Sequence, residues 1–265
     1  MALFKSITIG QYIPGNSTIH RLDPRTKIIG TVLLIVLLFM VDTFWGYALA
    51  ALAIAAIVHL SEIPPRLVLR GLRPLFVILL LTVSLHLFMT EGDPIFRFWI
   101  VEVTWQGLSR GIMMGVRLAL LVMGTSLLTL TTSPINLTDG IEGLLKPGKR
   151  IGIPAHELAM MMTIALRFIP TLLEEAEKIM KAQMARGADF QGGGLLQRAK
   201  SLIPLLVPLF VNAFRRADEL AIAMEARGYR GGEGRTKFKE LHFGRRDAIA
   251  LALAFGFVAV VGLLF

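Results

Sequence analysis

The tripeptide Ala-Arg-Gly occurs twice in the sequence, and each copy follows a long stretch with helical hydrophobic spacing. The copies are Ala185-Arg186-Gly187 and Ala226-Arg227-Gly228. An arginine guanidinium presents its N–H donors in a planar fork and stays charged when buried, and it pairs with carboxylates and backbone carbonyls in defined directions. The small neighbours, alanine and glycine, would let another protein close around each arginine. The chemistry that these residues indicate is therefore recognition of a partner protein.

A simpler interpretation is that each copy is only a basic helix end. Glycine just past a helix can take the left-handed conformation that closes the last turn, and an arginine one residue earlier gains from the helix dipole and can reach the last carbonyls. Two copies on two helices of similar layout favour a shared function instead. In that interpretation each arginine inserts into a receptor, and two similar tips indicate two identical or homologous receptors.

Other candidate chemical motifs are incomplete. Residues 143–150, GLLKPGKR, match the spacing of a phosphate-binding loop, but Arg150 stands where serine or threonine would bind magnesium. Pro147 lies within the loop, and no strand is expected before it. His156-Glu157 lacks the second histidine of a zinc-protease motif, and the chain has no cysteine for disulfides or thiolate metal sites. We therefore expect no enzyme activity, cofactor or metal in this chain, and an energy source on a partner.

The composition shows what kind of protein must position these groups. The chain has 265 residues, of which 54% are hydrophobic, whereas a soluble chain is about 45–50% apolar. Several runs reach the roughly 20 apolar residues that cross a bilayer, so the composition predicts an integral membrane protein. Residues 1–26 are polar and contain prolines, so no cleavable signal peptide is expected. The net charge of +9 fits a cytoplasmic bias of basic loops, and no basic stretch is interleaved with aromatics as a nucleic-acid partner would require.

Five apolar stretches are expected to cross the cell membrane, at residues 26–44, 45–60, 74–90, 106–131 and 248–265. Basic residues near membrane ends stay in the cytoplasm, and here they precede the first span, follow the second and precede the fifth. The acidic 91–105 loop and the C-terminus are therefore expected outside, and the N-terminus in the cytoplasm. Within the spans, His86 is expected to be neutral and hydrogen-bonded between helices, and Arg117 to snorkel outward or pair with an acidic residue.

The region between the fourth and fifth spans is expected to be a cytoplasmic domain of three amphipathic helices, at about 134–146, 154–186 and 195–227. The predicted fold is thus all-α and polytopic. Residues 1–132 would hold the first four spans, 133–240 the coupling domain, and 241–265 the final span. Two related receptors on the cytoplasmic side would suggest the paired ATPases of an ABC-type transporter.

The two long helices share one layout: an apolar start, proline, an amphipathic shaft and an Ala-Arg-Gly tip. Each is expected to begin at membrane level and to end in water. Pro170, Pro204 and Pro208 are expected to kink the helices and to offer hinges. Arg167 is expected to hold the bend at Pro170 by bonding the carbonyls that the proline frees.

Three features of the sequence resemble a known family. They are YIPGNSTIHRLDPRTKI at residues 12–28, ALRFIP at 165–170, and the paired tips. Together they resemble the transmembrane T component of energy-coupling factor (ECF) transporters over essentially the whole chain. The N-terminal stretch is more similar to the shared type of T component, which serves several S components, than to the type dedicated to cobalt or nickel.

The resemblance implies a membrane scaffold that connects two ABC ATPases, which bind ATP and magnesium, to a separate substrate-binding membrane protein, the S component. Such complexes import vitamins or transition-metal ions. The residues that would sit in grooves of the two ATPases are Ala185, Arg186, Gly187, Ala226, Arg227 and Gly228. The surface for the S component should be apolar and adaptable, which suits Met160, Met161 and Met162; ordinary packing within the membrane is the alternative for these methionines.

Three other functions are weighed against this one. A self-contained secondary transporter would show repeats and paired polar groups at mid-membrane, but the similar segments here lie in the expected cytoplasmic region. A membrane-embedded enzyme would need converging acids, bases or metal ligands in the spans. The permease of a conventional ABC importer would use a short coupling loop between spans rather than two long helices with matching tips.

Overall fold

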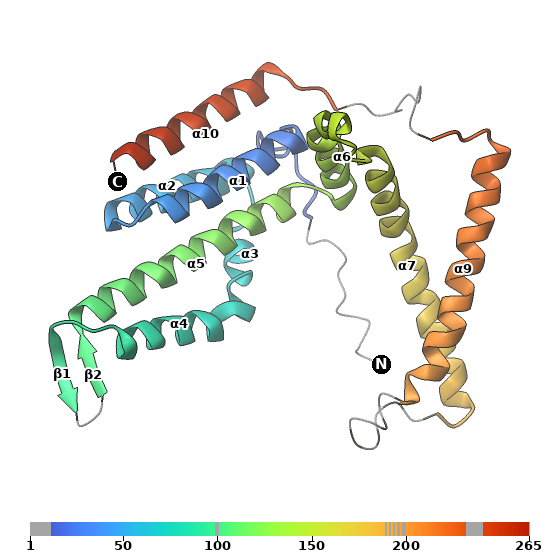
Figure 1. The fold of residues 1–265 in the computed structure, drawn as a ribbon, viewed down its shortest axis with the longest axis horizontal. Coiled ribbons are helices and arrows are strands. Elements are labelled where there is room, and N and C mark those ends of the chain that lie inside the picture. The colour runs from blue at the N-terminus through green and yellow to red at the C-terminus, as the bar shows by residue number, and fades with distance from the viewer. Residues whose placement is uncertain are drawn as a thin grey trace. The chain divides into compact units, whose positions relative to one another are not determined.

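The structure is a computed structural model that describes residues 12–98, 101–188, 200–231 and 241–264, together with residues 190, 192, 194 and 197. Of residues 94–98 and 101–103 it describes the backbone only. The chain divides into two compact units, one made of residues 10–140 with 241–265 and the other of residues 141–240. The fold is that of an all-α polytopic membrane protein, as expected (Figure 1). One short antiparallel hairpin, β1 (Pro94–Phe98) with β2 (Val101–Thr104), lies within the loop expected outside.

The first unit is a bundle built around α5. Its helices match the expected spans within a few residues, with a short connection of α3 and the 3-10 turn η1 between the second and third. In Figure 1 α1, α4 and α10 run in one direction and α2 and α5 in the other. Helix α5 contacts α1, α2, α3 and α4, and α10 packs on α1. The elements are α1 (Pro24–Met40), α2 (Phe44–Ser61), α3 (Pro65–Arg70), η1 (Arg73–Leu75), α4 (Phe76–Met89), α5 (Trp105–Thr131) and α10 (Arg245–Leu264).

Polar side chains cap the helices of this unit. Asp23 precedes α1 and accepts a hydrogen bond from the Arg25 amide at 2.8 Å, with Pro24 in the first turn. Thr104 does the same for α5, since its hydroxyl accepts from the Gly107 amide at 3.0 Å. Caps of this kind satisfy amides that the helix itself leaves unbonded. The Asp-Pro pair at residues 23–24 is thus a helix start.

Glycines allow α5 to approach α4 closely. Gly107, Gly111 and Gly115 recur at every fourth residue, on the side of α5 that faces α4. A Cβ atom at Gly107 would lie 2.7 Å from the His86 carbonyl oxygen, and one at Gly111 would lie 3.1 Å from the Val83 carbonyl oxygen. Lipid gives apolar helices little reason to associate, so packing at this range is what holds them together.

A buried carboxylate joins the start of α1 to the start of α10. Asp247 Oδ1 accepts a hydrogen bond from the Asp23 amide at 2.7 Å, and Oδ2 accepts one from the Gly244 amide at 2.9 Å. Both aspartates are buried. We call this contact, between residues far apart in the sequence, the Asp23–Asp247 link.

The rest of the 12–28 stretch is also tied down. Lys27 Nζ donates to the His20 carbonyl oxygen at 3.1 Å and to the Thr131 carbonyl oxygen at 3.0 Å, which adds the end of α5 to the same cluster. The His20 ring is hydrogen-bonded to the Ser17 hydroxyl and to the Ile13 carbonyl oxygen. These residues therefore hold together the bundle end at which α1 begins.

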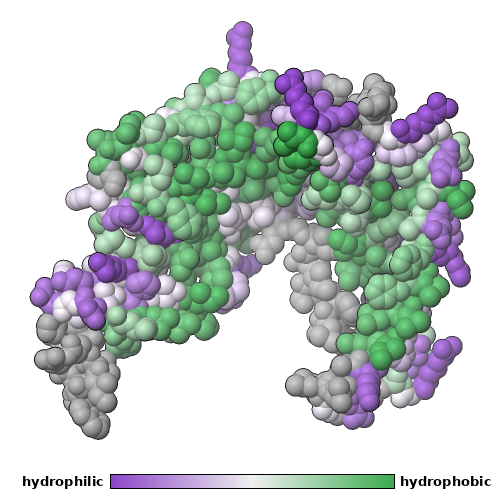
Figure 2. Space-filling view, in the orientation of Figure 1, coloured by the Kyte–Doolittle hydropathy of each residue, from purple (hydrophilic) through white to green (hydrophobic). Residues whose placement is uncertain are grey.

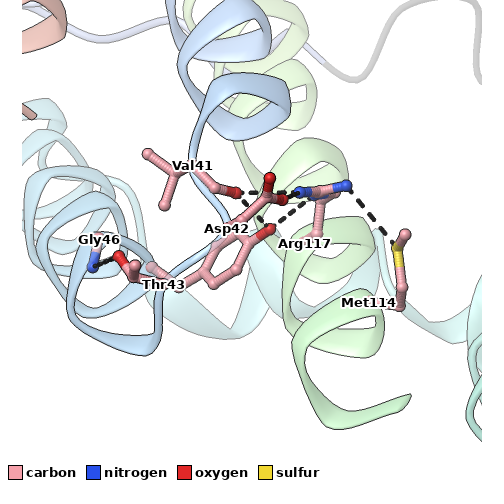
Figure 3. Close-up of polar contacts among 7 residues, drawn as sticks. Val41, Asp42, Thr43, Gly46, Met114 and Arg117 are labelled. Atoms are coloured by element: carbon pink, nitrogen blue, oxygen red, sulfur yellow. Dashed lines mark hydrogen bonds and ion pairs between the residues drawn. The ribbon is translucent and has the colours of Figure 1, made fainter. Parts of the chain in front are cut away.

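Arg117 fixes the turn between α1 and α2 to α5 (Figure 3). Its Nε donates to the Tyr47 hydroxyl at 2.7 Å, and its Nη2 contacts the Val41 carbonyl oxygen at 2.9 Å and the Asp42 carboxylate at 2.8 Å. The arginine side chain is only 12% exposed. Of the two alternatives expected for Arg117, snorkelling outward or pairing with an acidic residue, the structure shows the pairing. His86 differs from its expectation, because its Nδ1 bonds to the Thr82 carbonyl oxygen one turn earlier in the same helix.

Apolar side chains cover much of the visible surface (Figure 2). No residue of α4 is buried, and Val77 and Met89 are more than two thirds exposed. By length and composition, five described helices could cross a membrane: α2, the stretch Pro65–Met89, α5, α7 (Ala155–Ala185) and α10. Five spans were also expected from the sequence, but the two sets differ in one helix. The set found here includes α7 and leaves out α1, whose 17 residues make it shorter than the other five.

The second unit contains the end of α6 (Pro134–Leu145), the 3-10 helix η2 (Lys146–Ile151), α7 and α9 (Ile203–Ala226). Residues 197, 200 and 201 are helical, as the expected helix from about 195 requires, but α9 itself begins only after a break at Leu202. Pro204 accounts for this start, because a proline ring clashes with the carbonyl four residues earlier but fits the first turn of a helix. The end of α6 and the 3-10 helix η2 form the GLLKPGKR stretch, and a helix rather than a strand leads directly into it, so it lacks the setting of a phosphate-binding loop.

The glycine contacts between α4 and α5 predict that Gly107→Ala destabilises the protein, although alanine is the better helix former. The new Cβ would displace the backbone of α4, at a cost of about 1–3 kcal/mol. Gly256→Ala in α10 is the matched control, since nothing lies within 4 Å of its added Cβ. Thermal unfolding in detergent should show a lower midpoint for Gly107→Ala only. Equal midpoints for the two variants would contradict the close packing.

The Asp23–Asp247 link predicts a second stability effect. Asp247→Ala removes the acceptor of the Asp23 and Gly244 amides, and the loss at the buried Asp23 amide costs about 1–3 kcal/mol. Asp247→Asn keeps one acceptor oxygen and should fall between the wild type and the alanine variant. Arg246→Ala, at the exposed neighbouring position, is the control, and thermal unfolding is the measurement. If Asp247→Ala unfolds at the midpoint of the control, the link contributes nothing.

Candidate partner-binding site

The first Ala-Arg-Gly copy closes the C-terminal end of α7. Arg186 follows the last helical residue with φ −87° and ψ 5°, and Gly187 takes a left-handed conformation with φ +90°. The Gly187 amide donates to the Met184 carbonyl oxygen and the Ala188 amide to the Gln183 carbonyl oxygen, both at 3.0 Å. This pair of hydrogen bonds is a Schellman motif.

The second copy closes α9 in the same way. Arg227 has φ −88° and ψ 8°, and Gly228 has φ +70°. The Gly228 amide donates to the Glu225 carbonyl oxygen at 2.8 Å, and the Tyr229 amide donates to the Met224 carbonyl oxygen at 3.1 Å. The two tips therefore share one backbone geometry and not only one sequence.

The closing bonds leave both arginine side chains uncommitted. Residues 185–187 and 226–228 are all exposed. In the part of the chain that the structure describes, no hydrogen bond or ion pair involves the guanidinium of Arg186 or Arg227, and backbone amides bond two of the terminal carbonyls of each helix. The simpler interpretation is confirmed in part, because a left-handed glycine closes each helix, but the described contacts include no bond from either arginine side chain to the last carbonyls.

Helices α7 and α9 form an antiparallel pair (Figure 1). Gln183 Nε2 contacts the Pro204 carbonyl oxygen at 3.4 Å, so the end of α7 lies beside the start of α9. Near the middle, Glu175 accepts a hydrogen bond from Asn212 Nδ2 at 2.5 Å and forms an ion pair with Arg216 at 3.2 Å. We call this contact the Glu175 crossing.

The antiparallel pairing places the two tips at opposite ends of the pair. Arg227 and Thr163 line the same cavity, whereas Arg186 lies beyond the start of α9. From Thr163 to Arg186 the helix rises about 35 Å, at about 1.5 Å per residue. Both helices were expected to begin at the level of the membrane and to end in water, and this expectation is wrong. The chain reverses between them, so each tip lies beside the start of the other helix.

The other predicted residues fall in three places. Met160 is half-buried and lines the cavity beside Arg227, whereas Met161 and Met162 are 55% and 42% exposed. Pro170 and Pro208 lie inside α7 and α9. Pro204 is in the first turn of α9 and is therefore no hinge within a helix. Arg167 makes no bond to the carbonyl freed at Pro170 among the described contacts, and it lines the cavity at the second tip instead.

The position of two arginines at this cavity was not predicted from the sequence. Arg167 and Arg230 lie with Arg227 around it, although they come from different elements. Only the spacing of Arg230, three residues after Arg227, was a signal in the sequence. The proximity of Arg167 depends on the register between α7 and α9, which no local pattern shows.

The comparisons with known proteins agree on one family. A family model described as cobalt transport protein, CbiQ, matches residues 15–238. A protein of Thermosediminibacter oceani is 62% identical over 256 residues, which cover 97% of this chain and 96% of the relative. A protein of Clostridium kluyveri is 55% identical, over 97% of this chain and 96% of its own length, and one of Bacillus subtilis is 51% identical over 92% and 93%. All three carry the name energy-coupling factor transporter transmembrane protein EcfT.

The shared tip geometry predicts that Gly228→Ala opens the end of α9. A left-handed alanine costs about 1 kcal/mol more than glycine, which corresponds to about fivefold faster opening. Hydrogen exchange of the Tyr229 amide should quicken by that factor, and Gly187→Ala should have the same effect at Ala188. Gly194→Ala is the control, with nothing within 4 Å of its Cβ and no positive φ. Unchanged exchange at Tyr229 would refute the assignment.

Proposed function

This chain belongs to the CbiQ family, as a transmembrane component of ECF transporters, and from that membership we propose a specific role for it. It is the scaffold and coupling subunit of an ECF-type ABC importer. The two Ala-Arg-Gly tips bind two ATPase subunits, and the helices behind them transmit the motion of these ATPases to a separate substrate-binding S component. The observation that carries the proposal is the same arginine display at both ends of one antiparallel helix pair.

The separation of the tips supports two receptors rather than one. Arg186 and Arg227 lie about 35 Å apart along the pair, so a single groove would not hold both. Because the two tips have matching backbone angles, they fit two identical or homologous subunits. These subunits would bind ATP and magnesium, and this chain would bind neither.

The charge distribution of the first unit supports a cytoplasmic N-terminus and an external C-terminus. The starts of α1 and α10 meet at the Asp23–Asp247 link, and the Thr18 hydroxyl reaches the end of α2 at the Leu60 carbonyl. Basic residues gather near this end, and lysine and arginine near membrane ends stay inside. Asp42, Glu91 and Asp93 lie toward the other end, where α1 and α4 finish. The basic residues are Arg21, Arg25, Lys27, Arg66, Arg70, Arg73, Arg245 and Arg246.

The transported substrate, a vitamin or another micronutrient, would bind to the S component. Among the described residues of this chain, no group of three or more His, Asp or Glu side chains could hold a metal ion. The S component would contact Met160, Met161 and Met162 at the start of α7. Methionine adapts to varied partners, and two of these three side chains are substantially exposed.

The Glu175 crossing suggests how motion passes along the pair. It lies about 16 Å from the Arg186 tip and about 18 Å from the level of Thr163, from the rise of a helix. Pro170 and Pro208 lie one to two turns from the residues of the crossing, and each removes a helical hydrogen bond. When ATP draws the two ATPases together, the tips would move relative to each other, and the shafts would pivot at the crossing and bend at these prolines.

The proposal predicts that Arg186→Glu and Arg227→Glu each weaken ATPase binding. An arginine that fills a groove contributes about 2 kcal/mol or more, which corresponds to about a thirtyfold loss of affinity. The double variant should lose both ATPases and substrate uptake. Co-purification and binding of the purified ATPases are the measurements.

Arg215→Glu is the control for this experiment. It makes the same change of charge at an exposed position of α9 away from the tips, and it should leave binding near the wild-type value. A double variant that still retains both ATPases and supports uptake would disprove the role of the tips.

A further inference from the structure

Three arginines surround one cavity at the second tip. The cavity has a volume of about 650 Å³, and Arg167 reaches it from α7 while Arg227 and Arg230 reach it from the end of α9. The other described lining residues include the apolar side chains of Met160, Ile164, Leu220 and Met224, together with Thr163, Tyr229 and two glycines. The site thus joins a concentrated positive charge to an apolar surface.

The charge of this cavity is not balanced by the residues that line it. None of the described residues that line it is acidic, and the described contacts contain no ion pair or hydrogen bond for the three guanidiniums. Other arginines of the chain do have partners, such as Arg117 with Asp42 and Arg216 with Glu175. Like charges held near one cavity repel each other, so an anionic group that enters it gains from all three.

We propose that this cavity receives an acidic segment of the ATPase that binds the Arg227 tip. The inference rests on the proposed function and extends it, because it adds Arg167 and Arg230 to the ATPase contact. Carboxylates of the segment bind these two arginines in the forked geometry that guanidinium favours. An apolar side chain of the same segment packs on Ile164 and Leu220.

We favour a protein segment over a lipid phosphate in this cavity, because the tip residue Arg227 is itself part of the cavity wall. Arg227 lines the cavity and is also the residue that the ATPase groove would enclose. Any subunit that closes around Arg227 must cover Arg230, which is three residues further along the chain, and must meet Arg167 on the other wall. The same approach that buries the tip therefore brings partner side chains into the cavity.

The test measures the affinity of the purified ATPases for the membrane protein in nanodiscs of neutral phosphatidylcholine. Arg167→Glu and Arg230→Glu should each weaken binding about tenfold, and their double variant should weaken it further. Binding of the double variant should also depend less steeply on salt, since fewer charge pairs form. Arg167→Gln and Arg230→Gln should have smaller effects, which separates loss of attraction from repulsion. Arg215→Glu is again the matched control.

A photo-crosslinking residue placed at position 167 or 230 should capture an ATPase subunit. Capture of lipid instead, or an effect of the variants only in nanodiscs with anionic phosphatidylglycerol, would overturn the inference in favour of a lipid headgroup. If Arg227→Glu loses the ATPase while Arg167→Glu and Arg230→Glu bind like Arg215→Glu, the inference fails and the proposed function stands. If Arg227→Glu also binds normally, both fail.

Discussion

The form of the two helix tips depends on how the C-terminal ends of α7 and α9 satisfy their own carbonyl groups. A helix leaves its last carbonyls without intrahelical partners, and an arginine at that position would ordinarily be drawn to them. In α7 and α9 the amides of Gly187 and Gly228, and of the residues after them, take these carbonyls. This is possible because glycine accepts a left-handed backbone at low cost. Neither guanidinium has a partner among the described contacts, so under the proposed function the glycine matters as much as the arginine.

The antiparallel pairing of α7 and α9 puts the two displayed arginines at opposite ends of one helix pair. Tips on parallel helices would lie together at one end, whereas these tips lie about 35 Å apart along the pair. The Glu175 crossing holds the pair near its middle through one hydrogen bond and one ion pair. The two ends of the pair have different neighbours. The start of α7, with its methionines, lies beside the Arg227 tip, whereas the start of α9 lies beside the Arg186 tip.

Much of the fold could be predicted from the sequence, because apolar runs of bilayer length and capping residues are local signals. The spans, the tips and the helix start at Asp23-Pro24 all follow from patterns within a few residues. The start of α9 could not be placed, since Pro204 suits both a kink and a first turn. The antiparallel register of α7 and α9, the Asp23–Asp247 link and the position of Arg167 were out of reach because each joins residues far apart in the chain. His86 was assigned to a neighbouring helix, whereas the nearest carbonyl lay one turn away in its own.

The Asp23–Asp247 link has a consequence for how the protein is made. The two aspartates are 224 positions apart, so the ribosome must complete nearly all of the described chain before the amide of Asp23 meets its acceptor. Until then α1 lacks the surface of α10 and one buried amide stays without its bond. Helix α10 can therefore pack on α1 only after the helices that lie between them in the chain have been made.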